Sequence, residues 1–398
     1  MTDEHSRSFR GWRMVAVCFV VATLAWGFGF YGQGVYLANL LAARGWSLSL
    51  VSGAITGFYF ISAVMVAFVA DWIARFGARR VVAAGLVATG VAAALLGAVR
   101  EPWQLYAAYL LMSFGWASTS LAAVTTILGM WFSERRGLAV SLALTGASAG
   151  GILVVPALQA LITAQGFATA MLVGGGLLVA VGAPLAFWLI EAPPVVPQAG
   201  AGARPAAQTK GQLLRDFRFW SFGGPFAILW VTQMAFLTHE INIFAPVVGP
   251  VGAAAAVAAT TFAAVAGRVL LGAVVDRLDR RLVTAVSVST QAAALLALVV
   301  WPQPAVFYAA AVVYGLSVGN VITLPALIVQ KEFDAAAFGV VVALATSVTQ
   351  MLGSTGPALL GFGRDVAGGY GLPVVCCALA NLCAAAAILA LRPGPRAA

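Results

Sequence analysis

The sequence has 398 residues, of which 62% are hydrophobic and 9% are charged, with a mean hydropathy of +0.97. Soluble domains carry about 25% charged residues, so this composition excludes a soluble enzyme or binding domain and indicates a chain that crosses a membrane many times. The net charge of +9 does not indicate nucleic acid as a partner, because the basic residues lie in short loops between apolar stretches and form no patch interleaved with aromatic residues.

The chain begins with a charged segment, MTDEHSRSFRGWR, which leads into an apolar run too long for a signal peptide. We interpret this run as a retained first span, and eleven further apolar stretches follow, each near the length of about 20 residues that crosses a bilayer as a helix. In chain order the predicted spans are 12–37, 50–72, 81–99, 104–130, 138–162, 168–190, 219–241, 254–275, 283–301, 305–329, 337–361 and 372–391. Four cysteines lie within these stretches without zinc-ligand spacing, and we expect them to be packing residues.

One polar stretch, residues 191–218, is rich in Pro, Ala and Gly and is long enough to join two domains. It separates the first six spans from the last six. The sequence therefore predicts an all-α membrane protein with an N-terminal six-helix half (1–190), a linker (191–218) and a C-terminal six-helix half (219–398).

The basic residues predict the orientation, because short cytoplasmic loops carry an excess of Lys and Arg. With the N-terminus inside, 18 of the 22 basic residues fall on the cytoplasmic side, while Arg44, Arg100 and Arg364 fall outside and Arg268 lies within a span. We therefore expect a multi-pass protein of a cytoplasmic (inner) membrane with both termini in the cytoplasm.

The two halves resemble each other at a constant offset of 202 residues. Residues 75–80 (RFGARR) match residues 277–282 (RLDRRL), and residues 136–151 match residues 338–353. One offset at two separate places indicates an ancestral six-span repeat. Repeats of this kind build transporters in which substrate binds near the membrane midplane and the two halves alternate access to it.

Arg268 stands inside an apolar run, eight residues before Asp276. A rise of 1.5 Å per residue places it about 12 Å from that charged boundary, near the middle of a hydrocarbon core about 30 Å thick. An arginine there costs at least ~2.5–3.5 kcal/mol, but its planar guanidinium matches a carboxylate, so we interpret Arg268 as the anchor of an organic anion. The alternative is a structural arginine paired with an acid of a neighbouring span, although the acids near membrane depth (Asp71, Glu240 and Asp276) all lie near span ends.

Two copies of one loop motif resemble the signature of the major facilitator superfamily. GAVVDRLDRR, residues 272–281, fits that signature with Asp279 where a glycine is usual. The first-half copy, VADWIARFGARR, has Ala74 where an aspartate is usual and Asp71 nearly one turn earlier. The resemblance covers essentially the whole chain and implies the major facilitator fold, with twelve transmembrane helices in two pseudo-symmetric halves.

A narrower resemblance is to the monocarboxylate transporter family and the related oxalate:formate exchangers. It rests on WFSERRGLAVSLALTG at 131–146, on GWRMVAV at 11–17 and on Gly-Trp-Ser at 45–47. That family keeps an arginine in span 8 for the substrate carboxylate, which implies this role for Arg268. The chain departs from the animal members because Ala264 stands where they carry an aspartate and because the first span lacks their lysine. Proton coupling by that pair therefore does not carry over.

His239 and Glu240, in span 7, are the predicted proton-coupling residues. Counted from Arg218, His239 lies about 31 Å along the span, near the outer face. A histidine titrates near physiological pH, and a desolvated glutamate can do the same. A solvated or capping pair at a helix end is the alternative interpretation.

The charged loops after spans 2 and 8, together with the loop before span 5, are the predicted gates. Their arginines can hydrogen-bond carbonyls at helix C-termini and acids of adjacent spans when the cytoplasmic side is closed, while a purely topogenic role is the alternative. The predicted gating residues are Asp71, Arg75, Gly77, Arg79, Arg80, Arg135, Arg136, Asp276, Arg277, Arg280 and Arg281.

Polar and aromatic side chains within spans 1, 4, 5, 10 and 11 are candidates for the rest of the substrate site, because these spans line the cavity of the resembled fold. A mostly apolar site with a few polar groups suits a small amphipathic anion, and interhelical hydrogen bonding is the alternative for each residue. Besides Arg268, the predicted substrate-binding residues are Tyr31, Gln33, Trp116, Thr119, Thr145, Tyr314, Asn320 and Gln350.

These expectations combine into a secondary transporter for a small monocarboxylate or related organic anion, with cotransport of a proton. The sequence offers no P-loop, metal-ligand cluster or nucleophile–base pair, so we expect no enzymatic activity, no cofactor and no nucleic acid. The expected partners are the anion, a proton and the lipid bilayer around a monomer. Efflux of amphipathic compounds by proton antiport, anion exchange without protons, an intramembrane enzyme and a receptor of the same fold are the alternatives. The missing lysine and aspartate favour exchange.

Overall fold

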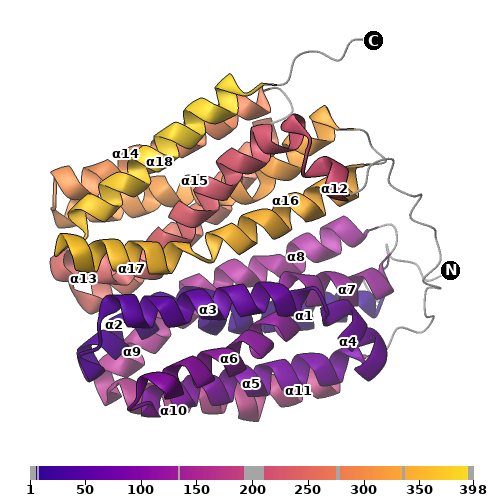
Figure 1. Cartoon of the computed structure of the whole chain (residues 1–398). Helices are drawn as coiled ribbons and strands as arrows, with labels where there is room; N and C mark the ends of the chain where they lie inside the picture. Colours follow the sequence, from indigo (N-terminus) through magenta and orange to yellow (C-terminus); the bar gives the residue numbers. More distant parts are fainter. Residues whose placement is uncertain are drawn as a thin grey trace. The chain divides into compact units, whose positions relative to one another are not determined.

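The computed structural model describes residue 6 and residues 9–132, 135–191, 210–274, 278–333 and 337–392. The described residues form helices and no strand (Figure 1). The chain divides into two units, unit 1 from residue 1 to 199 and unit 2 from residue 200 to 398.

Unit 1 contains the first six apolar spans, three of which include a π-helical turn. Its elements, with η for a π-helical turn, are α1 (Gly11–Trp26), η1 (Gly27–Tyr31), α2 (Gly32–Arg44), α3 (Leu48–Val66), α4 (Val69–Phe76), α5 (Ala78–Ala98), α6 (Pro102–Thr119), α7 (Leu121–Trp131), α8 (Arg136–Ala149), η2 (Gly150–Val154), α9 (Val155–Gln165), α10 (Phe167–Leu177), η3 (Leu178–Gly182) and α11 (Ala183–Leu189). The first span runs for 34 residues from Gly11 to Arg44, beyond the predicted end at residue 37. It continues because the polar residues after the apolar run are compatible with a helix, and Gly45, with a φ of 64°, ends it.

Unit 2 begins with one helical turn and then a long element that contains two spans. Its elements are α12 (Lys210–Leu213), α13 (Phe217–Val274), α14 (Arg280–Val300), α15 (Pro304–Glu332), α16 (Phe338–Gly353), α17 (Gly356–Ala367) and α18 (Gly371–Ala390). The backbone of α13 is not helical at Gly249, where φ is 73° and ψ is 167°, between Pro246 and Pro250. This break divides α13 into a first arm (span 7) and a second arm (span 8).

In the described part of the chain, ten helices are long and apolar enough to cross a membrane. This number agrees with twelve spans, because α13 holds two of them and the eleventh is divided into α16 and α17, of 16 and 12 residues. The protein is therefore a multi-pass membrane protein, and the predicted all-α class is confirmed.

Corresponding helices pack in the same pairs in both units. In unit 1, span 1 packs on span 5, span 4 packs on spans 2 and 3, and span 6 packs on span 3. In unit 2, α13 packs on α16 and α17 through its first arm and on α15 through its second arm, α15 also packs on α14, and α18 packs on α14. The two halves are thus two copies of one six-helix arrangement.

Glycines allow the closest helix crossings, since small residues let backbones approach. In unit 1, a Cβ atom at Gly175 of α10 would lie 2.3 Å from the Gly90 carbonyl oxygen of α5. In unit 2, a Cβ atom at Gly267 would lie 1.9 Å from the Leu316 carbonyl oxygen of α15. The second arm of α13 and α15 therefore touch through their backbones, one residue before Arg268.

Candidate functional site

Arg268 lies on the second arm of α13, at its crossing with α15. A Cβ atom at Gly319 of α15 would lie 2.1 Å from the Ala264 carbonyl oxygen and 3.2 Å from the Arg268 Cβ. The Arg268 side chain is half-buried. The glycines thus bring the α15 backbone against the base of this side chain and fix the point from which the guanidinium extends.

Two other predicted substrate residues lie on α15 in different surroundings. Asn320, next to Gly319, donates from Nδ2 to Ser287 Oγ over 3.4 Å, and its Oδ1 has no partner among the described residues. Tyr314 is 1% exposed and packs on Phe236 with ring centroids 4.4 Å apart. Asn320 therefore lies beside the Arg268 crossing, whereas Tyr314 lies in the core of unit 2.

In unit 1, Tyr31 and Trp116 belong to a group of half-buried rings that we call the aromatic cluster. Its members are Trp26, Phe30, Tyr31, Tyr59 and Trp116. The ring centroids of Trp26 and Trp116 lie 4.9 Å apart, and Phe30 stacks on Trp116 at 6.2 Å with an interplanar angle of 21°. The cluster joins spans 1, 2 and 4 and presents aromatic surface that is only partly covered.

Gln33 supports the π-helical turn η1 beneath this cluster. A π-helical turn leaves main-chain carbonyls without their regular helical donors. Here Tyr36 donates its hydroxyl to the Phe28 carbonyl over 2.9 Å, and Gln33 Nε2 donates to the Gly29 carbonyl over 3.0 Å. Gln33 is fully buried, so its amide nitrogen serves the helix of span 1.

The three remaining predicted substrate residues belong neither to the Arg268 crossing nor to the aromatic cluster. Thr119 is 1% exposed, and its hydroxyl donates to the Gly115 carbonyl of its own helix. Thr145 and Gln350 are exposed. The Thr145 hydroxyl donates to the Leu142 carbonyl over 2.6 Å.

His239 is fully buried, with a partner at each ring nitrogen. Its Nε2 lies 3.0 Å from the Pro357 carbonyl oxygen, and its Nδ1 lies 3.0 Å from the Tyr370 hydroxyl oxygen. Because a carbonyl only accepts, Nε2 carries a proton and donates, and Nδ1 of the neutral ring accepts from Tyr370. The imidazole thereby links the first arm of α13 to α17 and to the residue before α18.

Glu240 is also fully buried. The Thr260 hydroxyl, on the second arm of α13, donates to its Oε1 over 2.6 Å. Its Oε2 has no hydrogen-bond partner among the described residues. The two neighbours in sequence therefore have different environments, one with both polar atoms bonded and one with a single bond.

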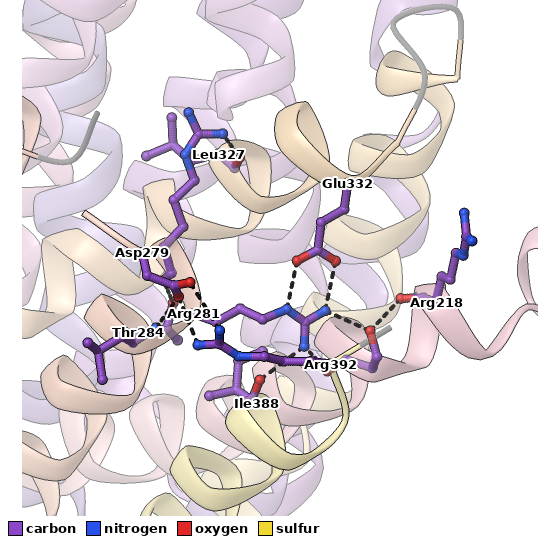
Figure 2. A network of polar contacts seen from close by, with 11 residues as sticks. Arg218, Asp279, Arg281, Thr284, Leu327, Glu332, Ile388 and Arg392 are labelled. Carbon is purple, nitrogen blue, oxygen red and sulfur yellow. Dashed lines mark hydrogen bonds and ion pairs between the residues drawn. The ribbon is translucent and has the colours of Figure 1, made fainter. Parts of the chain in front are cut away.

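Arg281 is the centre of a polar network at the start of α14, which we call the Arg281 network (Figure 2). The side chain is 4% exposed and makes two hydrogen bonds to the Glu332 carboxylate, of 2.7 and 2.8 Å. It also donates to Ser221 Oγ over 2.8 Å and to the Ile388 carbonyl over 3.0 Å. One guanidinium therefore holds together α13, α14, α15 and α18.

Asp279 lies just before α14 and is more exposed. Its carboxylate accepts from the Leu282 N–H over 2.9 Å and forms a two-point ion pair with Arg392 at 3.0 and 3.1 Å. The Leu282 N–H, with further help from Arg392, holds the pKa of the Asp279 carboxyl below its ordinary value. Arg280 donates to the Leu327 carbonyl of α15.

The predicted gating residues of unit 1 lie at an exposed corner. Asp71, Arg75, Gly77, Arg79 and Arg80 are all exposed. The Arg75 guanidinium carbon lies 5.3 Å from the Phe76 ring centroid, and that of Arg79 lies 5.6 Å from the Phe187 centroid. Arg135 is half-buried, whereas the Arg136 side chain and all of Asp276 and Arg277 lie outside the described residues.

Comparison with known proteins decides the family. Residues 16–357 match the Major Facilitator Superfamily domain. The chain belongs to the Major Facilitator Superfamily. It is therefore a membrane transporter for small molecules, as predicted, and its family is not one of enzymes.

Relatives of this Major Facilitator Superfamily chain include monocarboxylate transporter 11 of Mus musculus, which is 30% identical over 334 residues, or 76% of this chain and 70% of that protein. A solved bacterial homolog of the human lysosomal transporter Spinster, inward-facing and unoccupied, has a TM-score of 0.74 and 14% identity and covers 98% of this chain and 100% of its own. The nucleoside transporter NupG has a TM-score of 0.75 and 14% identity over 96% of this chain and 98% of its own. These structures confirm the fold.

Several residues of this transporter were not predicted from the sequence. Glu332 follows Lys331 at the end of a span and looks like a loop charge, so nothing in the sequence pairs it with Arg281. Thr260 is one of two adjacent threonines in an alanine-rich run, without a visible link to Glu240. The aromatic cluster had a signal in the Trp-Gly-Phe-Gly-Phe-Tyr sequence of residues 26–31, since glycines between aromatic residues allow rings to meet.

Proposed function

We propose that this transporter carries small organic monocarboxylates or related organic anions, and that Arg268 binds their carboxylate. The proposal rests on the position of Arg268, a permanent charge on an apolar helix, at a crossing where the α15 backbone lies against its Cβ. A planar guanidinium binds a carboxylate through two parallel hydrogen bonds. The relationship to a protein named monocarboxylate transporter 11 supports the same class of substrate.

We also propose that one proton crosses with each anion, by alternating access, so that net movement is electroneutral. The charge bias of the loops supports a location in an inner membrane with both termini in the cytoplasm. Anion exchange without protons is the competing mechanism, and it is favoured by Ala264 and by the absence of a lysine in the first span.

Uptake into proteoliposomes tests the proposal, with labelled lactate, pyruvate, a longer 2-oxo acid and an aromatic monocarboxylate under an inward proton gradient. Loss of a hydrogen-bonded charge costs a bound anion about 1.5–3 kcal/mol, so Arg268→Ala should lose roughly 10- to 100-fold in apparent affinity. Arg268→Lys should recover only part of it, because an ammonium lacks the planar fork.

Arg364→Ala is the matched control, because Arg364 is an exposed arginine whose side chain is 44% accessible and pairs with the adjacent Asp365. It should transport like the wild type. Full activity of Arg268→Ala, or no transport of any of the four acids by the wild type, would overturn the proposal.

A further inference from the structure

Glu240 poses a problem of charge. Its carboxyl is fully buried and, within the described residues, one hydroxyl, that of Thr260, donates to Oε1 while no group donates to Oε2. An ionised carboxylate in such a site loses its hydration and gains little in return, and groups placed in this way take the neutral form instead.

The position of Glu240 along the helices is deep. It lies nine residues before the break at Gly249 and Thr260 lies eleven residues after it, which corresponds to about 13 and 16 Å of helix. Tyr314 lies ten residues into α15, about 15 Å from its start. Span 7 was predicted to end at residue 241, but the helix continues to Val248. Glu240 therefore lies about 13 Å of helix before the Gly249 turn, and not at the end of the span as predicted.

Within the described residues, the hydrogen bond from Thr260 is the polar contact made by the Glu240 carboxyl. Tyr314 of α15 packs on Phe236, which lies one turn before Glu240 on the first arm. His239 precedes it in sequence, but the His239 ring contacts α17 and Tyr370. Thr260 is the group that faces it from the second arm.

His239 differs from Glu240, because each polar atom of its side chain has a hydrogen-bond partner. Its neutral ring already uses both nitrogens, one as donor to Pro357 and one as acceptor from Tyr370. These two contacts engage both ring nitrogens in holding α17 and Tyr370 against the first arm of α13. A proton gained by this ring would replace the acceptor at Nδ1 and require the Tyr370 hydroxyl to turn.

We propose that Glu240, and not His239, is the residue that carries the coupled proton, with His239 as a structural link. This inference rests on the proposed proton-coupled transport of an anion. The Glu240 carboxylate takes one proton from water on one side and becomes a neutral carboxylic acid while one anion is bound. The transporter then changes the side from which the site is open, and the acid releases the proton to water there as the anion leaves. The anion's single negative charge and the proton's positive charge cancel, so no net charge moves.

Transport measurements on Glu240→Gln separate proton coupling from anion binding. Glutamine has the shape of the protonated acid and keeps an acceptor for Thr260. A gradient of about one pH unit drives about tenfold accumulation through a one-to-one symporter. The variant should exchange external for internal anion at equal pH like the wild type and should lose the tenfold accumulation.

His239→Gln and Glu101→Gln are the controls, the second because Glu101 is an exposed carboxylate. Both should keep gradient-driven accumulation. Accumulation that survives in Glu240→Gln, or disappears in His239→Gln while exchange is intact, would overturn the assignment. Wild-type exchange without accumulation would overturn it as well, because no proton would then be coupled.

Infrared difference spectroscopy tests Glu240 without any substrate, and so separates this inference from the proposed function. The carbonyl stretch of a protonated carboxylic acid at neutral pH should be present in the wild type and in Glu101→Gln and absent in Glu240→Gln. If no acid is transported but this band behaves as stated, the monocarboxylate proposal fails and the protonated Glu240 stands. An identical spectrum for wild type and Glu240→Gln would overturn the inference.

Discussion

The start of α5 in unit 1 and the start of α14 in unit 2 are two copies of one basic motif in different surroundings. At the offset of 202 residues, Arg79 corresponds to Arg281. Arg281 is 4% exposed and bonded to an acid and to main-chain oxygens, whereas Arg79 is exposed and lies over the Phe187 ring. The same arginine is thus buried and links four helices in unit 2, whereas it is exposed at the surface in unit 1.

The acid at the end of α15, Glu332, accounts for the difference. Glu332 corresponds to Met130 at the same offset, so unit 1 has no carboxylate at the position that pairs with Arg281 in unit 2. Asp279 likewise corresponds to Gly77, and Asp279 caps α14 where Gly77 offers no side chain. A repeated motif therefore conserves the location of a charge, while its neighbours determine what the charge does.

Removal of Arg281 should produce the largest effect of the comparison. Arg281→Met leaves the Glu332 carboxylate in a site built for an ion pair, and breaking a buried pair costs about 3–5 kcal/mol. The corresponding change in unit 1, Arg79→Met, should cost less than about 1 kcal/mol. Thermal unfolding of the purified protein in detergent measures both.

The double variant Arg281→Met/Glu332→Met sharpens this result. An apolar pair in place of a buried ion pair is often neutral or stabilising, so the double variant should recover most of the lost stability. If Arg281→Met and Arg79→Met lowered the stability by the same amount, the two arginines would make equally strong contacts, contrary to the structure.

The glycine crossing beside Arg268 should give the second largest effect. Gly319→Ala places a Cβ atom 2.1 Å from the Ala264 carbonyl oxygen, so α13 and α15 must separate, at a cost of about 1–3 kcal/mol. The shift also moves the base of Arg268, and we expect weaker anion binding together with the lower melting temperature.

Gly176→Ala in unit 1 is the matched control, because a Cβ atom at Gly176 meets nothing within 4 Å. On helix propensity alone it should be neutral or stabilising by up to about 1 kcal/mol. Wild-type stability and binding in Gly319→Ala would contradict the close approach of these two helices.

The fold could be predicted from the sequence because its signals are local or repeated. A run of about 20 apolar residues predicts a span by itself, and the offset of 202 residues predicts the duplication. The positions of helix ends depend on residues that break a helix, such as Gly45 and Gly249, whose φ values are 64° and 73°. The sequence shows that these residues are glycines, but it does not show that a helix ends or breaks there. The predicted first span was therefore too short, and the eleventh was not predicted to divide.

The site was less predictable, because its contacts join residues far apart in the chain. Arg268 was identified as a charge in an apolar run and Glu240 as a charge near the outer end of span 7. The roles of Thr260 and Glu332 become visible only where helices meet. Gln33 illustrates the same limit in the other direction. It was predicted to bind substrate, which stays a prediction, and the structure adds that its amide nitrogen donates to the Gly29 carbonyl of a π-helical turn that the sequence did not predict.

Asp279 should contribute a smaller, pH-dependent effect. Its folded pKa lies below its ordinary value, so the stabilisation is complete above the unfolded carboxyl value near 3.8 and is lost as the pH falls through the folded value. Because the carboxylate is 42% accessible, we expect less than about 1 kcal/mol. Asp279→Asn, which keeps a capping side chain, should therefore melt below the wild type at neutral pH and together with it in acid.

The smallest effect should come from the Arg79 contact with Phe187, and it completes the comparison. An exposed cation over a ring contributes about 0.5–1 kcal/mol, so Phe187→Leu and Arg79→Gln should each lower stability by that amount or less, and the double variant by no more than either alone. A double-mutant cycle in detergent isolates the pair. A coupling as large as that between Arg281 and Glu332 would mean that an aromatic ring can replace the missing acid of unit 1. A coupling below about 1 kcal/mol would show that Arg79 is free to act as a surface charge.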